Sequence, residues 1–143
     1  PKSPRHRDPR RRSMSVEEKL VDQYLQLCED RQLTDASKFL DPEILMVFPG
    51  NKKFTSLQEM AQGAKGRYNW VKKRRTDFTT CAAGADTVVT SRGTLYGERI
   101  DGTPFADIRY IDYFVIRNEK IVEQHVWNDL AELGITQPNS EES

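Results

Sequence analysis

Residues 105–127 decide the fold, and they read FADIRYIDYFVIRNEKIVEQHVW. The β-branched and aromatic side chains of Phe105–Ile116 predict one long strand, and those of Ile121–Trp127 predict a second strand. The polar pair Asn118-Glu119 separates the two strands and predicts a tight turn. This segment therefore predicts a long antiparallel hairpin, which must bury one of its faces.

Upstream of this hairpin, further strands are predicted by similar patterns. Trp70–Ala82 and Thr87–Glu98 are rich in β-forming residues, and Asp101-Gly102 is the strongest hairpin signal in the chain. The apolar run Ile44–Phe48 ends at Pro49-Gly50 and predicts a short buried strand. The sheet is therefore expected to contain at least five strands.

Helices are predicted mainly in the first half of the chain. Ser15 is a good N-cap, and Glu18 completes a capping-box pattern before an apolar stripe that includes Tyr24. The other predicted helices cover Asp35–Leu40, Leu57 to about Arg67, and Asp129–Leu133. The order helix, helix, strand, helix, then four strands is typical of the α+β class and not of a parallel sheet.

We therefore expect a curved, mostly antiparallel sheet that wraps around the N-terminal helices and forms a cone with a pocket. This cone domain is expected to span residues 15–134. Residues 1–14 carry three prolines and a run of arginines, which predicts a disordered basic arm, and residues 135–143 predict a disordered acidic tail.

Charge and composition narrow the partners that we expect. Residues 14–143 contain 16 basic and 21 acidic side chains, which argues against a nucleic-acid-binding surface on the domain. The basic run Lys72-Lys73-Arg74-Arg75 is interpreted as protection of an exposed edge strand. No stretch of 18 apolar residues occurs, so no membrane span is predicted, and a cytoplasmic location is expected. Two cysteines and two histidines give no metal-ligand spacing, and no cofactor is expected.

Two stretches resemble a known family. The run from Tyr110 to Gly134, YIDYFVIRNEKIVEQHVWNDLAELG, resembles the closing segment of SnoaL-like proteins of the nuclear transport factor 2-like superfamily. The stretch Arg92–Gly97, RGTLYG, is similar to the preceding hairpin of that family. The resemblance covers about residues 15–134. It implies the cone fold of ketosteroid isomerase and scytalone dehydratase, which hosts isomerases, dehydratases, cyclases and non-catalytic proteins.

The similarity to ketosteroid isomerase implies roles for three positions. Tyr24 matches the oxyanion-binding tyrosine on the first helix, and Asp112 matches the protonated aspartic acid on a late strand. Phe48 stands where that enzyme has its carboxylate base. Because phenylalanine cannot move a proton, isomerisation by that mechanism is not expected here.

The residues themselves also single out Asp112. It shares a face of its strand with Tyr110 and Phe114, and a carboxyl on such an apolar face must be paired, protonated or hydrated. We therefore expect Asp112 and Tyr24 to be catalytic, although a structural ion pair of Asp112 with Arg92 or Arg109 would also fit the pattern. Six further residues are expected to bind substrate: Phe48, Trp70, Tyr110 and Phe114, together with Gln124 and Asn128, whose face of the last strand points inward according to the resemblance.

Three functions remain open at this point. The first is a cofactor-free enzyme that performs acid–base chemistry, of the isomerase, dehydratase or cyclase type, on a small apolar or polyketide-like compound. The second is a non-catalytic protein that binds a small apolar ligand, and the third is a dimeric scaffold. In each case we expect a homodimer through the outer sheet face, because Tyr113 and Trp127 would otherwise expose an apolar patch.

Overall fold

A six-stranded curved sheet is the framework of the computed structural model, which describes residues 13–136. The strands are β1 (Leu40–Phe48), β2 (Lys52–Phe54), β3 (Trp70–Ala83), β4 (Asp86–Glu98), β5 (Pro104–Arg117) and β6 (Lys120–Asn128). Their order is β2-β1-β6-β5-β4-β3. Only β1 and β6 pair in parallel; every other neighbouring pair is antiparallel.

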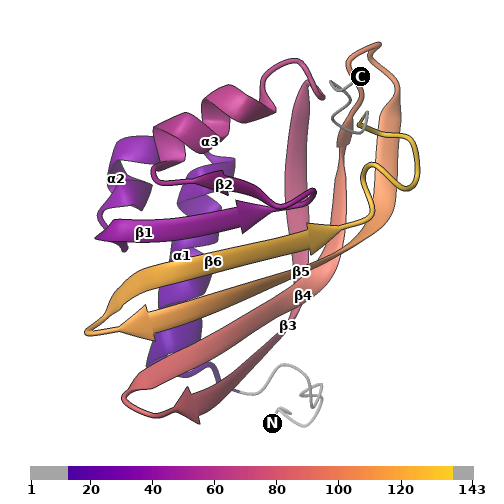
Figure 1. Cartoon of the computed structure of the whole chain (residues 1–143). Helices are drawn as coiled ribbons and strands as arrows, with labels where there is room; N and C mark the ends of the chain where they lie inside the picture. The colour runs from indigo at the N-terminus through magenta and orange to yellow at the C-terminus, as the bar shows by residue number, and fades with distance from the viewer. Residues whose placement is uncertain (1–12, 137–143) are drawn as a thin grey trace, which may run out of the picture.

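Three helices lie on one side of this sheet: α1 (Val16–Glu29), α2 (Leu33–Ser37) and α3 (Leu57–Ala64). The long strands β3, β4 and β5 bend, so that the sheet curls around the side where the helices lie (Figure 1). The predicted α+β class, with a curved and mostly antiparallel sheet around N-terminal helices, is confirmed. No helix within residues 13–136 combines the length and apolarity that crossing a membrane would require.

Helix α1 begins at a capping box and is joined to β3 of the sheet by ion pairs. At its start, the Glu18 backbone N–H donates to Ser15 Oγ and the Ser15 N–H donates to the Glu18 carboxylate, each at 3.1 Å, which confirms the capping box. The Arg75 guanidinium of β3 donates to Asp22, in the middle of the helix, at 2.6 Å and to Glu29, its last residue, at 2.8 Å. These contacts hold the apolar face of α1 against the concave face of the sheet.

Several boundaries differ from the sequence prediction. Helix α2 spans Leu33–Ser37 instead of Asp35–Leu40, because the chain becomes extended at Leu40. The proline at position 42 therefore lies within β1, where the pairing with β6 shifts register and no backbone donor is needed. The short strand β2 was not predicted. It adds an edge to β1, which the sequence pattern of three residues could not indicate.

The predicted helix at residues 129–133 is wrong. Residues 129–134 form turns, and Asn128 Oδ1 accepts a hydrogen bond from the Leu130 N–H at 3.1 Å. The residues after this turn, Ile135 and Thr136, are buried. Residues 1–12 and 137–143, which carry most of the expected basic arm and acidic tail, lie outside the described residues.

Two apolar clusters make up the core. The larger cluster joins α1 and α2 to β1, β5 and β6, and it includes Tyr24, Met46 and Phe114. The smaller cluster lies toward the other end of the sheet and includes Leu95, Tyr110 and Leu130. The candidate site lies where these two clusters approach each other.

Candidate functional site

Two cavities share a wall between the helices and the concave face of the sheet. The smaller has a volume of about 130 Å³ and the larger a volume of about 360 Å³. The residues that line both are Phe48, Met60, Ala64, Tyr68, Val71, Lys73 and Leu95. Most of these side chains are apolar, so the charged group of Lys73 is the exception in the shared wall.

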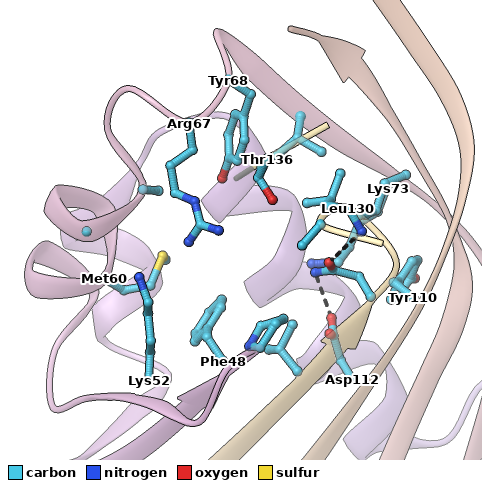
Figure 2. Close-up of a pocket in the computed structure, with 18 of the residues that line it drawn as sticks. Phe48, Lys52, Met60, Arg67, Tyr68, Lys73, Tyr110, Asp112, Leu130 and Thr136 are labelled. Atoms are coloured by element: carbon cyan, nitrogen blue, oxygen red, sulfur yellow. Dashed lines mark hydrogen bonds and ion pairs between the residues drawn. The ribbon is translucent and has the colours of Figure 1, made fainter. Parts of the chain in front are cut away.

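Asp112 lines the smaller cavity, and its side chain is fully buried. It lies on β5 with Tyr110 and Phe114 on the same face, and both of these neighbours are buried as the alternation predicts. Its partner is Lys73 on β3, whose Nζ lies 3.1 Å from Asp112 Oδ2 (Figure 2). The expected buried acid is therefore present, and it is paired with a lysine rather than with Arg92 or Arg109.

The ion pair leaves the carboxylate with unused hydrogen-bonding capacity. Within residues 13–136, no donor meets hydrogen-bond geometry at either Asp112 oxygen. A buried polar atom without a hydrogen bond raises the free energy of the folded state, and such atoms often mark functional sites. Oδ2 is in contact with Lys73, and Oδ1 retains the capacity to accept a hydrogen bond from a molecule in the cavity.

Burial and charge shift the pKa values of this pair. Burial raises the pKa of Asp112, and the nearby Lys73 ammonium opposes that shift without cancelling it. Burial by itself lowers the pKa of Lys73, but the Asp112 carboxylate and Tyr110 outweigh it, so the pKa of Lys73 is raised. Lys73 therefore remains an ammonium, while Asp112 holds a proton more strongly than an ordinary aspartic acid.

Tyr110 completes the polar group around this pair. Its hydroxyl lies 2.9 Å from Ser91 Oγ, and the Lys73 ammonium lies 5.2 Å from the centre of its ring. Such a position over an aromatic face stabilises a cation. Tyr110 thus supports Lys73 and also lines the smaller cavity with Asp112.

Tyr24 does not face the same space as Asp112. It lines the larger cavity, and its hydroxyl donates to Gln124 Oε1 at 2.7 Å in a buried hydrogen bond. Burial raises the pKa of Tyr24 well above its usual range. The structure therefore places the two expected catalytic residues in adjoining cavities, with Lys73 lining both.

Of the remaining predicted site residues, all but Phe114 line at least one of the two cavities. Phe48 lines both cavities, Asn128 lines the smaller one, and Gln124 lines the larger one. Trp70 lines the larger cavity but is 38% exposed, with its ring edge-on to Tyr96. Phe114 lines neither cavity. It packs in the larger apolar cluster, edge-on to Tyr24, because its place on β5 lies directly beneath α1.

Lys73 is the residue that the sequence prediction missed. Val71, Lys73 and Arg75 occupy the less exposed alternate positions of β3, while Lys72 and Arg74 are exposed. The alternation itself was the available signal, because a strand directs every second side chain of a basic run to the same face. The smaller cavity is also lined by Lys52 and Arg67, which the sequence prediction did not select. Within the described residues, no group of three potential metal ligands comes together.

This architecture, a curved sheet that closes around helices and leaves a polar group in an apolar cavity, defines a class of cone-shaped pocket proteins. The sequence matches no protein-family model and no curated protein. Solved structures do match. One is a nuclear transport factor 2-like protein of unknown function from Burkholderia pseudomallei, with a TM-score of 0.71 and 15% identity. The match covers 87% of this chain and all of the other.

Two further matches have similar extent. TerC, crystallised with polyporic acid, has a TM-score of 0.68 and 13% identity over 83% of this chain and 95% of its own. A candidate SnoaL-like polyketide cyclase from Shewanella putrefaciens has a TM-score of 0.65 and 12% identity over 85% of this chain and 84% of its own. The chain therefore has the nuclear transport factor 2-like fold of SnoaL-like proteins, as the resemblance of its sequence implied.

Proposed function

We propose that the smaller cavity binds a small, mostly apolar molecule and that Asp112 and Lys73 perform acid–base chemistry on it without a cofactor. The observation that carries this proposal is the buried Asp112 carboxylate, which borders the cavity, is ion-paired with Lys73 and has no hydrogen bond to either oxygen within residues 13–136. The names of two similar proteins support the class of ligand, since one was crystallised with polyporic acid and another is a candidate polyketide cyclase.

The chemistry follows from the two side chains. Asp112 as a carboxylate accepts a proton from a carbon or hydroxyl of the bound molecule, and it returns that proton at a second position. The Lys73 ammonium lies beside it and stabilises the negative charge that develops on a substrate oxygen. Positioned acid–base groups of this kind contribute rate factors of about 10²–10⁴. Isomerisation, dehydration or cyclisation of a polyketide-like compound needs no more than this set of groups.

The other lining residues hold the molecule in place. Phe48, Val71 and Leu95 give the cavity its apolar surface, and Tyr110 and Asn128 provide polar groups beside the carboxylate. Tyr24 is not assigned a direct role in this cavity, because it lines the larger cavity instead and its hydroxyl is engaged by Gln124. This engaged hydroxyl favours the second candidate function, a non-catalytic protein that binds the same class of ligand.

Titration of Asp112 separates these two functions. We expect carbon-13 NMR of the side-chain carboxyl to give a pKa above the ordinary value of about 3.9, because burial disfavours the charged form. In Lys73→Met the pKa should rise further, since the ammonium that favours the carboxylate is lost. Asp101 is an internal control, because hydrogen bonds from Thr103 lower its pKa. An Asp112 pKa at or below 3.9 would leave a binding protein and remove the proposed proton carrier.

We further propose a homodimer through the outer face of the sheet. Tyr113 is 37% exposed and Trp127 is 55% exposed on this face. His125 lies between them, with ring centres at 5.7 Å from Tyr113 and 6.1 Å from Trp127. These three rings form a continuous aromatic patch, which a second copy of the chain would cover by the same patch.

Trp127→Glu should convert the dimer into a monomer, because it buries a charge at the centre of the interface. Sedimentation velocity at micromolar concentration measures this change. Ile100→Glu is the matched control, since Ile100 is 59% exposed in the loop between β4 and β5 and should leave the dimer intact. A monomeric wild-type protein at that concentration would contradict the proposal.

A further inference from the structure

The charges on the cavity walls differ in sign from those of the domain as a whole. Residues 13–136 carry 16 basic and 19 acidic side chains, so this part of the chain has a small net negative charge. Among the described residues, the only acidic side chains that line the two cavities are Glu29 and Asp112. The basic side chains that line them are Arg31, Lys52, Lys65, Arg67, Lys72 and Lys73. Cations are therefore concentrated at the cavities of an otherwise acidic domain.

Three of these cations are partly buried, and all three line the smaller cavity: Lys52, Arg67 and Lys73. Lys73 is paired with Asp112. Lys52 and Arg67 lie on the opposite side of the cavity from this pair (Figure 2). Lys52 makes no ion pair with any residue between 13 and 136. Among the described residues, Lys52 therefore places a cation without an acidic partner on the wall that faces Asp112.

A partly buried cation attracts an anion more strongly than an exposed one, because less water screens the interaction. At the other end of the cavity, the Asp112 carboxylate and the Lys73 ammonium together carry no net charge, so an anionic group is attracted less strongly there than at Lys52. An elongated anion is thus oriented, with its charge toward Lys52 and Arg67 and its apolar body along Phe48, Val71 and Leu95. In that orientation the uncharged end of the molecule reaches Asp112.

We propose that the natural ligand is an organic anion, an apolar body that carries a carboxylate or an acidic hydroxyl group, held at its charged end by Lys52 and Arg67. This inference rests on the small-molecule-binding function proposed above and specifies the class of ligand. It gives Lys52 and Arg67 the role of binding residues that select charge, while Asp112 and Lys73 act at the other end.

Strand β2 offers a matched pair of lysines for the test. Lys52 and Lys53 are adjacent, and Lys52 is half-buried in the cavity wall whereas Lys53 is exposed and lines neither cavity. Lys52→Met and Lys53→Met remove the same charge from the chain, so they differ only in where the charge is lost. Lys52→Arg keeps the charge at the cavity and reports on whether position 52 tolerates substitution.

The probes are 2-naphthoate and 2-acetylnaphthalene, which have the same ring system and a similar shape but differ in charge. Binding is followed by shifts of the backbone amide signals of Val71, Leu95 and Val126, all of which line the smaller cavity. We expect the wild-type protein to bind the carboxylate at least about tenfold more tightly than the ketone. Lys52→Met should weaken naphthoate binding about fivefold and leave ketone binding unchanged, while Lys53→Met and Lys52→Arg should bind both probes as the wild type does.

Three results would overturn the inference. Equal or tighter binding of the ketone removes the preference for anions and leaves the cavity as a binding site. If Lys52→Met and Lys53→Met weaken naphthoate binding equally, the effect comes from the net charge of the protein and not from the cavity wall. If neither probe shifts the amide signals of the cavity residues, both this inference and the proposed binding function fail.

Discussion

Asp112→Leu is expected to lower the free energy of unfolding by about 3 kcal/mol, because it leaves the Lys73 ammonium without its partner. Breaking a buried ion pair costs about 3–5 kcal/mol, and the lower end applies here since the Lys73 side chain is 21% exposed. The double variant Asp112→Leu/Lys73→Met removes both charges and fills the space with apolar groups. Its free energy of unfolding should lie within about 1 kcal/mol of that of the wild type.

The single variant Lys73→Met should lower the free energy of unfolding by an amount that depends on pH. Its Asp112 carboxyl remains buried, with a folded-state pKa above the unfolded value of about 3.9. Between these two pKa values the native state binds more protons than the unfolded state, so the free energy of unfolding falls as the pH rises. Urea unfolding at pH 5 and pH 8 with constant ionic strength measures this slope. The Asp112→Leu/Lys73→Met variant lacks the carboxyl and serves as the control without this contribution.

The double variant also bears on why the pair is present. If it is as stable as the wild type, the fold does not need Asp112 and Lys73, and a role in the chemistry of the cavity accounts for them better than a structural role. If instead each single substitution changes stability by less than about 0.5 kcal/mol, the two groups are not coupled in a buried site. In that case the acid–base proposal loses its main support.

The sequence predicted one half of this pair and missed the other for a physical reason. Asp112 was predictable because its neighbours at alternate positions of β5 are apolar and belong to the same strand. Lys73 and Asp112 come from strands separated by β4, and in the sheet register Lys73 pairs with Leu95 whereas Asp112 pairs with Ser91. Their side chains approach across β4, which the curvature of the sheet and the length of the Lys73 side chain allow. Neither the register nor the bend can be derived from local patterns.

The same distinction holds for the fold. The capping box at Ser15 and the turn at Asn118-Glu119 were predictable because each depends on a few consecutive residues, and both turn residues have positive φ. The parallel pairing of β1 with β6 joins segments that are far apart in the sequence, and the edge strand β2 is very short. Local sequence patterns therefore predict neither feature. For Phe114, the alternation along β5 correctly predicted that its side chain lies on the inner face of the sheet. It could not predict that a helix covers this side chain, because tertiary packing sets the position of the helix.

Gly93→Ala is expected to lower the free energy of unfolding by about 3 kcal/mol, because it forces two strands apart. A Cβ atom at this position would lie 1.9 Å from the Arg74 carbonyl oxygen, and this neighbour is backbone that cannot rotate away. Gly93 pairs with Arg75, next to the irregularity between Arg75 and Asp77 where β3 bends. The absence of a side chain thus lets the bend of β3 approach β4 closely.

This bend is also what connects Gly93 to the cavity. Lys73 lies two residues before Arg75 on β3, so displacing the strand at the bend moves the ammonium relative to Asp112. We therefore expect Gly93→Ala to alter the pKa of Asp112 as well as the urea midpoint. Thr94→Ala, one residue along β4, is the control and should cost less than about 1 kcal/mol. If Gly93→Ala unfolds at the wild-type midpoint with an unchanged Asp112 pKa, the close approach of β3 to β4 does not position the ion pair.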